Sequence, residues 1–135
     1  MQLDVLRQVK KPRLVACDTM NLWITIKKQA LLKLLKKIDV LLLNDEEARM
    51  LADTTSLAKA AEILRKAGIP RLIIKKGEHG SMMFGPEGSF IAPALPLPVV
   101  KDPTGAGDSF AGGMLGWLAT KPLTEENWRK AMLIG

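Results

Sequence analysis

Short unbroken apolar runs alternate along this chain with longer segments whose apolar residues recur at helical spacing. Two of the runs, at 14–17 and 40–43, have the length of a strand, and a third, Leu72–Ile74, lies within a strand expected at 71–75. A strand that is apolar on both faces must be covered on both faces, and such strands are typical of a parallel sheet between helices. The pattern therefore predicts an α/β fold with a mostly parallel sheet flanked by helices.

The segments between these runs have the features of helices and turns. In the segment 23–37, leucines gather on one side and lysines on the other, which is typical of an amphipathic helix. Helices are expected at 2–10, 23–37, 44–51 and 57–67, from a glycine-rich turn at 102–107 to about 119, and from about 124 onward. Two strands at 81–84 and 89–91 are expected to form a hairpin, followed by an extended connection at 93–98.

Composition limits the class of protein. The chain has 135 residues, 47% of them hydrophobic and 25% charged, which suits one folded domain rather than a disordered chain. Its single cysteine, Cys17, excludes an internal disulfide and indicates a reducing compartment, so a cytoplasmic protein with an inert buried thiol is expected. The chain starts with a helix and ends in the apolar run 131–134, so residues 1–135 are expected to form one partial domain.

A net charge of +6 indicates an anionic partner without identifying it. The lysines between 27 and 37 fit the solvated face of a helix better than a binding patch. Trp23, Trp117 and Trp128 are too scattered for a surface that stacks bases, so no nucleic-acid partner is expected. No apolar run approaches the ~20 residues of a membrane span, so no membrane partner is expected either.

The segment 102–110 carries the sharpest chemical signal, because a strand ends, small residues turn and a helix begins. The first amides of a helix have no partner within it and carry partial positive charge. With Gly105, Ala106 and Gly107 at this position, no side chain would block an approaching oxyanion, so the turn is a plausible phosphate cradle. Asp108 would either stabilise the helix start electrostatically or act as a base beside a phosphoryl group.

The whole string Asp-Pro-Thr-Gly-Ala-Gly-Asp-Ser-Phe at 102–110 resembles the C-terminal signature of the ribokinase-like (PfkB) carbohydrate kinases, and only Pro103 departs from it. Two further stretches resemble motifs of that family. The segment 44–48 is similar to its Asn-x-x-Glu motif, and 75–81 is similar to its Lys-x-Gly-x-x-Gly turn. The resemblance runs from about residue 13 onward and corresponds to the C-terminal half of the family's domain.

This resemblance implies a three-layer, Rossmann-like (ribokinase-like) fold, incomplete relative to the family fold. It implies an ATP-dependent kinase that phosphorylates a hydroxymethyl group of a small-molecule sugar or nucleoside. Asp108 would be the general base, and the amides from Gly105 to Asp108 would form the anion hole. The acceptor stays open, as does a possible homodimer of the full-length protein. The alternative is a non-catalytic fragment that binds nucleotide or phosphate and lacks the substrate half.

The other two motifs each allow a structural interpretation beside the functional one. By resemblance, Asn44 and Glu47 would organise Mg²⁺ and phosphates, partly through water, whereas their spacing alone predicts a helix capping box. By resemblance, Lys76, Gly77 and Gly80 would lie near ATP, whereas a tight turn between two strands also explains both glycines.

Two weaker matches complete the set of candidate residues. Asp102 and Thr104 could help to hold a monovalent cation such as K⁺, as in some relatives, although a plain turn at a strand end explains them equally well. Asp18 and Asn21 follow the first strand and loosely match an Asp-x-Asn-like element at the active-site edge of the family.

Overall fold

The structure is a computed structural model that describes residues 2–135, with side chains from residue 3 onward. The helices are α1 (Gln2–Gln8), α2 (Asn21–Leu35), α3 (Asp45–Ala52), α4 (Leu57–Lys66), α5 (Ala106–Ala119) and α6 (Glu125–Ile134), with a short 3₁₀ helix, η1 (Gly77–His79). The strands are β1 (Ala16–Asp18), β2 (Val40–Asn44), β3 (Arg71–Lys75), β4 (Ser81–Gly85) and β5 (Gly88–Ala92). In the described part of the chain, no helix is long and apolar enough to cross a membrane.

The five strands form one sheet in the order β1-β2-β3-β4-β5. The first three strands are parallel, with Asp18 opposite Leu42 and Asn44 opposite Lys75, so their carboxyl ends meet at one edge of the sheet. The hairpin of β4 and β5 continues the sheet in the antiparallel sense. This arrangement confirms the predicted α/β sheet and places the ends of three strands beside one another.

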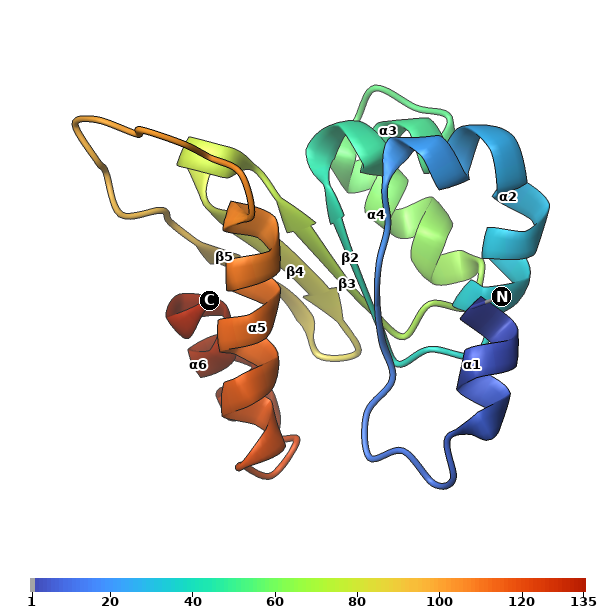
Figure 1. The fold of residues 1–135 in the computed structure, drawn as a ribbon. Helices are drawn as coiled ribbons and strands as arrows, with labels where there is room; N and C mark the ends of the chain where they lie inside the picture. Colours follow the sequence, from blue (N-terminus) through green and yellow to red (C-terminus); the bar gives the residue numbers. More distant parts are fainter. Residues whose placement is uncertain (1) are drawn as a thin grey trace.

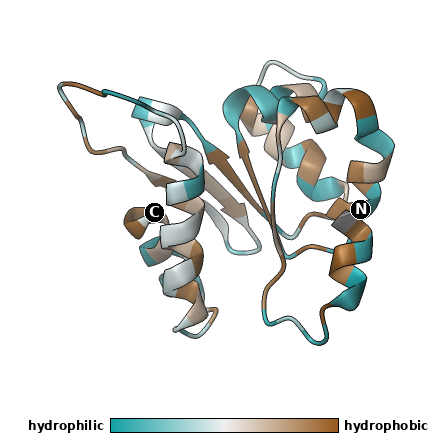
Figure 2. Ribbon diagram, in the orientation of Figure 1, coloured by the Kyte–Doolittle hydropathy of each residue, from teal (hydrophilic) through white to brown (hydrophobic). Residues whose placement is uncertain are grey.

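Helices cover both faces of the sheet, with α1 to α4 on one side and α5 and α6 on the other (Figure 1). Each face has its own apolar core. Leu41 and Leu43 of β2 pack into the core beneath α2, α3 and α4, whereas Val40 and Leu42 pack into the core beneath α5 and α6. Figure 2 shows the two central strands as the hydrophobic middle layer between these helices. The alternation along β2 explains why its run is unbroken, because both faces are buried.

The ends of the elements differ from the predicted ones by a few residues. The strand expected at 14–17 forms at Ala16–Asp18. Just before it, the amide of Val15 donates to the carboxylate of Asp39 at 2.7 Å, and the carbonyl of Val15 accepts from the amides of Asp39 and Val40 at 2.8 and 3.2 Å. The helix α2 begins without a side-chain cap and has non-helical backbone angles at Lys27. Side-chain caps at Ser56 and Thr124 fix the starts of α4 and α6.

Gly80 is required where the chain turns from β3 into β4. Its φ is 83°, and a Cβ at this position would lie 2.1 Å from the carbonyl oxygen of Ala92. We expect Gly80→Ala to lower the free energy of unfolding by about 2 kcal/mol or more, because strain and a backbone clash add together. Gly77→Ala is the matched control, since Gly77 also has positive φ (55°) but open space around it. If urea unfolding gives the two variants equal losses of stability, the close approach of Gly80 to Ala92 contributes nothing to the cost.

Candidate functional site

Polar residues end each of the three parallel strands: Asp18 ends β1, Asn44 ends β2 and Lys75 ends β3. Side chains alternate between the two faces along a strand. Leu42 and Ile73 belong to the core beneath α5 and α6, so the residues two positions further along, Asn44 and Lys75, face the same side. The strand geometry therefore gathers these polar groups on the α5 side, at the carboxyl edge of the sheet.

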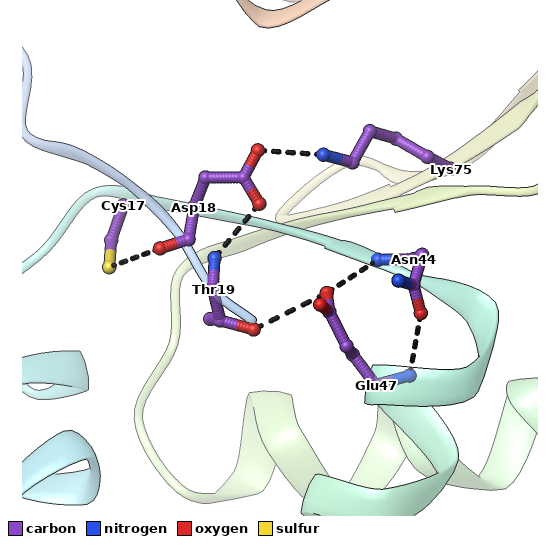
Figure 3. A network of polar contacts seen from close by, with 6 residues as sticks. All are labelled: Cys17, Asp18, Thr19, Asn44, Glu47 and Lys75. Atoms are coloured by element: carbon purple, nitrogen blue, oxygen red, sulfur yellow. Dashed lines mark hydrogen bonds and ion pairs between the residues drawn. The ribbon is translucent and has the colours of Figure 1, made fainter. Parts of the chain in front are cut away.

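A network of polar contacts connects these strand ends (Figure 3). The ammonium of Lys75 forms an ion pair with Asp18 Oδ2 at 2.6 Å, across the end of β2. The amide of Thr19 donates to the other oxygen of Asp18, Oδ1, at 2.8 Å. The hydroxyl of Thr19 donates to Glu47 Oε2 at 3.4 Å, which links this loop to the start of α3. The network holds one cation and two carboxylates close together.

Asn44 and Glu47 form a complete capping box at the start of α3. Asn44 Oδ1 accepts from the amide of Glu47 at 2.7 Å, and Glu47 Oε2 accepts from the amide of Asn44 at 2.9 Å. The structural interpretation of this motif is therefore confirmed, while its role toward Mg²⁺ stays a prediction. Glu47 is only 4% exposed, and this burial raises the pKa of its carboxyl, opposed by the hydrogen bond from Asn44.

The start of α5 presents backbone amides to the same edge. Gly105 has a φ of 78°, so the chain enters the helix through a left-handed residue. The amide of Ala106 already donates to the carbonyl of Pro103 at 3.1 Å. Within residues 2–135, the amides of Gly105, Gly107 and Asp108 have no acceptor in hydrogen-bond range. Of the four predicted donors, three are thus available to an anion.

Two cavities open at this edge of the sheet. A cavity of about 290 Å³, which we call the polar cavity, is lined by Asp18, Thr19, Met20, Trp23, Asn44, Glu47, Lys75 and Asp108. A second cavity of about 470 Å³, the glycine-lined cavity, is lined by Lys75, Gly77, Gly80, Ala106, Gly107 and apolar residues of β5, the 93–97 segment, α5 and α6. Lys75 lines both cavities, so it lies at the boundary between them.

The structure brings together most of the predicted site residues. Asp108, Asn44 and Glu47 line the polar cavity, and the loosely matched Asp18 lies with them. Asn21 is absent from the lining, because it begins α2 on the exposed side.

Four other predicted residues lie outside both linings: Lys76, Asp102, Thr104 and Gly105. Lys76 is half-buried, and its amide donates to the carbonyl of Gly80 at 2.8 Å, which closes the turn. Asp102 Oδ1 accepts from the amide of Thr104 at 2.9 Å, and this bond lowers the pKa of the Asp102 carboxyl. The contact is that of a turn, but no strand precedes it, because β5 ends at Ala92 and the segment from 93 to 105 has no strand. The expectation that a strand ends at residue 102 is therefore wrong, whereas the turn of the alternative interpretation forms.

Sequence reasoning missed Lys75, Thr19, Met20 and Trp23 as cavity residues. For Lys75 a signal existed, because a strand over 71–75 with alternating faces puts Lys75 and Ile73 on the same side. For Thr19, Met20 and Trp23 none existed, since their place depends on how the β1–α2 loop folds back toward Glu47.

The single thiol is poorly suited to nucleophilic chemistry. Burial, and to a smaller extent the charge of Asp18, raise the pKa of Cys17 to about 11. A thiol with this pKa is almost entirely protonated near neutral pH, and the thiolate is the reactive form. The raised pKa of Cys17 agrees with the prediction that this thiol is inert.

A sequence model of the pfkB family carbohydrate kinases matches residues 3–135 of the chain. The cytidine kinase of Thermococcus kodakarensis is 37% identical over 105 residues, which cover 74% of this chain and 37% of that protein. The 2-dehydro-3-deoxygluconokinase of Haemophilus influenzae is 38% identical over 96 residues, which cover 68% of this chain and 30% of that protein. The chain thus spans about a third of the length of these relatives.

Solved structures agree with this comparison. The aminoimidazole riboside kinase of Salmonella enterica, solved with aminoimidazole riboside and an ATP analog, superposes with a TM-score of 0.78 at 25% identity. The match covers 88% of this chain and 42% of that one. The fructokinase of Vibrio cholerae O395, at 21% identity and a TM-score of 0.79, shares the fold. With its predicted signature motifs in place at one sheet edge, this chain belongs to the pfkB family of carbohydrate kinases and has part of their ribokinase-like fold.

Proposed function

We propose that this chain carries the phosphoryl-transfer part of an ATP-dependent kinase whose acceptor is a hydroxymethyl group of a small sugar or nucleoside. The observation that carries the proposal is the start of α5. There, Asp108 lines the polar cavity, while the neighbouring Gly107 lines the glycine-lined cavity. An anion held by these amides would lie between the two cavities, beside a base.

In this proposal the nucleotide occupies the glycine-lined cavity and the acceptor occupies the polar cavity. Lys76 would add its charge from the turn whose glycines, Gly77 and Gly80, line the cavity wall. The amides of Gly105, Gly107 and Asp108 would bind the terminal phosphate, where backbone donors and the helix dipole stabilise negative charge. Bound in this way, the terminal phosphorus would face the acceptor hydroxyl across the boundary at Lys75.

ATP, the acceptor hydroxyl and Asp108 together account for every bond and proton in the transfer. The acceptor oxygen forms a bond to the γ-phosphorus as the bond to the β–γ bridging oxygen breaks, and that electron pair leaves with ADP. The proton of the acceptor hydroxyl moves to the carboxylate of Asp108, which is exposed and needs only hydrogen-bond reach. Positioning and charge stabilisation supply most of the acceleration in such transfers, so a rigid helix start suits the task.

The donor set fits Mg²⁺ that arrives with the nucleotide. Within residues 2–135, no cluster of three histidine, cysteine or acidic residues could hold a metal by itself. Mg²⁺ commonly keeps several waters and binds through one or two carboxylates and the substrate phosphates. Asn44 and Glu47 offer an amide and a carboxylate at the edge of the polar cavity. When bound, Mg²⁺ would neutralise phosphate charge, and K⁺ could be held near Asp102 and Thr104.

Glu47→Gln separates the metal role of this residue from its capping role. Glutamine can replace glutamate in a capping box, so we expect α3 to stay capped and the thermal midpoint to fall little. Loss of the carboxylate should raise the Mg²⁺ concentration that gives half-maximal ATP turnover by roughly 10- to 100-fold. Asn44→Ala is the contrasting variant, because it removes the cap and should cost about 1 kcal/mol of stability. If Glu47→Gln needs the same Mg²⁺ concentration as the original protein, the motif serves only to cap α3.

The same variant has a predictable pH dependence. Burial raises the pKa of Glu47 in the folded state, so the folded protein binds this proton more tightly than the unfolded chain. The resulting stabilisation is complete below the unfolded pKa and is lost as the pH rises through the folded pKa. Glu47→Gln should therefore lose less stability than the original protein across that window, as measured by urea unfolding at a series of pH values.

The proposal is tested with the full protein, ATP, Mg²⁺ and a panel of sugars, sugar acids and nucleosides. Formation of a phosphorylated acceptor, followed by ³¹P NMR, is the expected result. The relatives make cytidine and 2-dehydro-3-deoxygluconate the first acceptors to try. ATP binding without transfer to any acceptor would favour the alternative, a non-catalytic nucleotide-binding fragment.

A further inference from the structure

Trp23 is a large apolar side chain that belongs to neither hydrophobic core. Trp128 is buried in the core beneath α5 and α6, and Trp117 packs against that core, whereas Trp23 is part of neither cluster. The side chain of Trp23 is nevertheless half-buried, and it lines the polar cavity. A half-buried aromatic ring that contributes to no core and lines a cavity is a candidate contact for a ligand.

The start of α2 holds this ring at the cavity. In a helix, long side chains lean toward the amino-terminal end, so the ring of Trp23 leans toward the loop that carries Thr19 and Met20. The ammonium of Lys27 lies 5.7 Å from the ring centroid and lines neither cavity, so this cation–π contact fixes the ring from outside. Met20 is 48% exposed and adds a second apolar side chain to the same lining. We call Met20 and Trp23 the apolar wall.

The polar cavity thus has two kinds of lining. Asp108 comes from α5 and Trp23 from α2, and these helices lie on opposite faces of the sheet (Figure 1). The strand ends and Asp108 supply polar groups, whereas the apolar wall supplies an aromatic ring and a thioether. A ligand with hydroxyl groups at one end and a flat ring at the other would use both kinds of lining.

The charged groups of the polar cavity disfavour an anionic acceptor. Its lining holds three carboxylates, from Asp18, Glu47 and Asp108, and one ammonium, from Lys75. That ammonium is already paired with Asp18 at 2.6 Å, so the described residues of this lining include no unpaired cation for a carboxylate of the acceptor. An anionic acceptor would also lie beside the terminal phosphate of ATP, where like charges repel.

We propose that the acceptor is an uncharged nucleoside, whose base contacts the apolar wall while the hydroxymethyl group of its ribose reaches Asp108. The inference rests on the proposed function and narrows the class of acceptor. One tryptophan does not make a nucleic-acid surface, but it suffices for a single base, because every base has a π-face that stacks on an aromatic ring. A free sugar would leave the apolar wall unused, and a sugar acid would be repelled by the carboxylates.

Four acceptors test this inference with the full protein, ATP and Mg²⁺: cytidine, adenosine, ribose and 2-dehydro-3-deoxygluconate. We expect kcat/KM for the better nucleoside to exceed the values for ribose and for the sugar acid by roughly 10²-fold or more. Ribose lacks the base contact, and the sugar acid adds charge repulsion. A sugar or sugar acid that is phosphorylated as efficiently as the better nucleoside would overturn the inference.

Trp23→Leu removes the ring and should raise KM for the nucleoside by roughly 10- to 100-fold, the loss typical of one base–aromatic contact. KM for ribose, which has no base, and KM for ATP should each change by less than about twofold. Trp23→Phe keeps an aromatic ring and should recover most of the loss. Leu22→Ala is the matched control, because Leu22 is 50% exposed on the same helix and lines neither cavity.

Met20→Ser gives a second test in case Trp23→Leu does not fold. Met20 is the N-cap of α2 and makes no side-chain cap hydrogen bond, whereas serine is a favoured N-cap residue, so the thermal midpoint should not fall. Loss of this half of the apolar wall should still raise KM for the nucleoside by about threefold or more and leave KM for ribose unchanged.

The outcomes separate this inference from the proposed function. A rise in KM that is confined to the nucleoside, in Trp23→Leu and Met20→Ser but not in Leu22→Ala, supports both. If the original protein transfers phosphate and the folded variants change KM for nucleoside and ribose equally, the base does not contact the apolar wall, while the kinase function stands. If the original protein transfers phosphate to no acceptor, the proposed function fails and the inference fails with it.

Discussion

Asp108→Asn will lower kcat by about 10²- to 10⁴-fold, the range that a positioned general base contributes. The variant keeps the size of the side chain and the backbone amides of the α5 start, so ATP affinity should stay within about threefold. The contrast is expected because Asp108 lines the polar cavity, whereas in the proposed function the amides around it would bind the phosphate. Steady-state kinetics with saturating acceptor, together with calorimetric titration of ATP, measure both quantities.

A first-turn carboxylate also stabilises its helix by about 0.3–1 kcal/mol, and this effect needs its own control. Glu126→Gln provides it, because Glu126 lies in the first turn of α6, pairs with Lys130 and lines neither cavity. Both variants should lose similar, small amounts of stability, and only Asp108→Asn should lose turnover. If the two variants keep equal kcat, Asp108 serves the helix and is not the base.

Arg71→Met will lower the free energy of unfolding by about 3–5 kcal/mol, the loss typical of breaking a buried ion pair on one side. Arg71 Nη2 lies 2.8 Å from Glu125 Oε2, and both side chains are only 11% exposed. The guanidinium also lies over the ring of Trp128, 4.4 Å from its centroid. These contacts tie α6 to β3, so the thermal midpoint should fall by roughly 10 °C.

The reason for this large loss can be isolated. In Arg71→Met the carboxylate of Glu125 stays buried without its partner, and that uncompensated charge accounts for most of the cost. The double variant Arg71→Met, Glu125→Gln should therefore recover a substantial part of the lost stability. Lys66→Met removes the partner of Glu62 in an exposed pair and should cost less than about 1 kcal/mol. A double variant no more stable than Arg71→Met would contradict this explanation.

The layout of the fold could be predicted because most of its determinants are local. The run at 40–43 has no polar residue, which is typical of a strand covered on both faces, and β2 is covered in this way. The spacing of Asn44 and Glu47 predicts a helix start, and the capping box forms there. The glycines at 77 and 80 predict a turn, which the positive φ at both confirms.

The parts that sequence reasoning missed depend on contacts between distant segments. The motif contains two adjacent lysines. The alternation of faces along 71–75 puts Lys75 on the side of Ile73, but only the packing of α5 and α6 on that side shows that it faces the cavities. The ion pair with Asp18 joins residues 57 positions apart, and the one between Arg71 and Glu125 joins residues 54 apart. The sequence also could not predict that the amide of Ala106 donates to the carbonyl of Pro103, because this bond depends on the exact path of the chain through Pro103.

The central claim is that bare amides at the start of α5 bind the terminal phosphate of ATP. The most direct measurement is the ¹H–¹⁵N spectrum of the labelled protein during titration with Mg²⁺-ATP and, separately, with AMP. The account predicts that the amides of Gly105, Gly107 and Asp108 shift strongly with ATP and little with AMP, while the bonded amide of Ala106 shifts less. ATP binding that moves amides elsewhere and leaves those of Gly107 and Asp108 unchanged would contradict it.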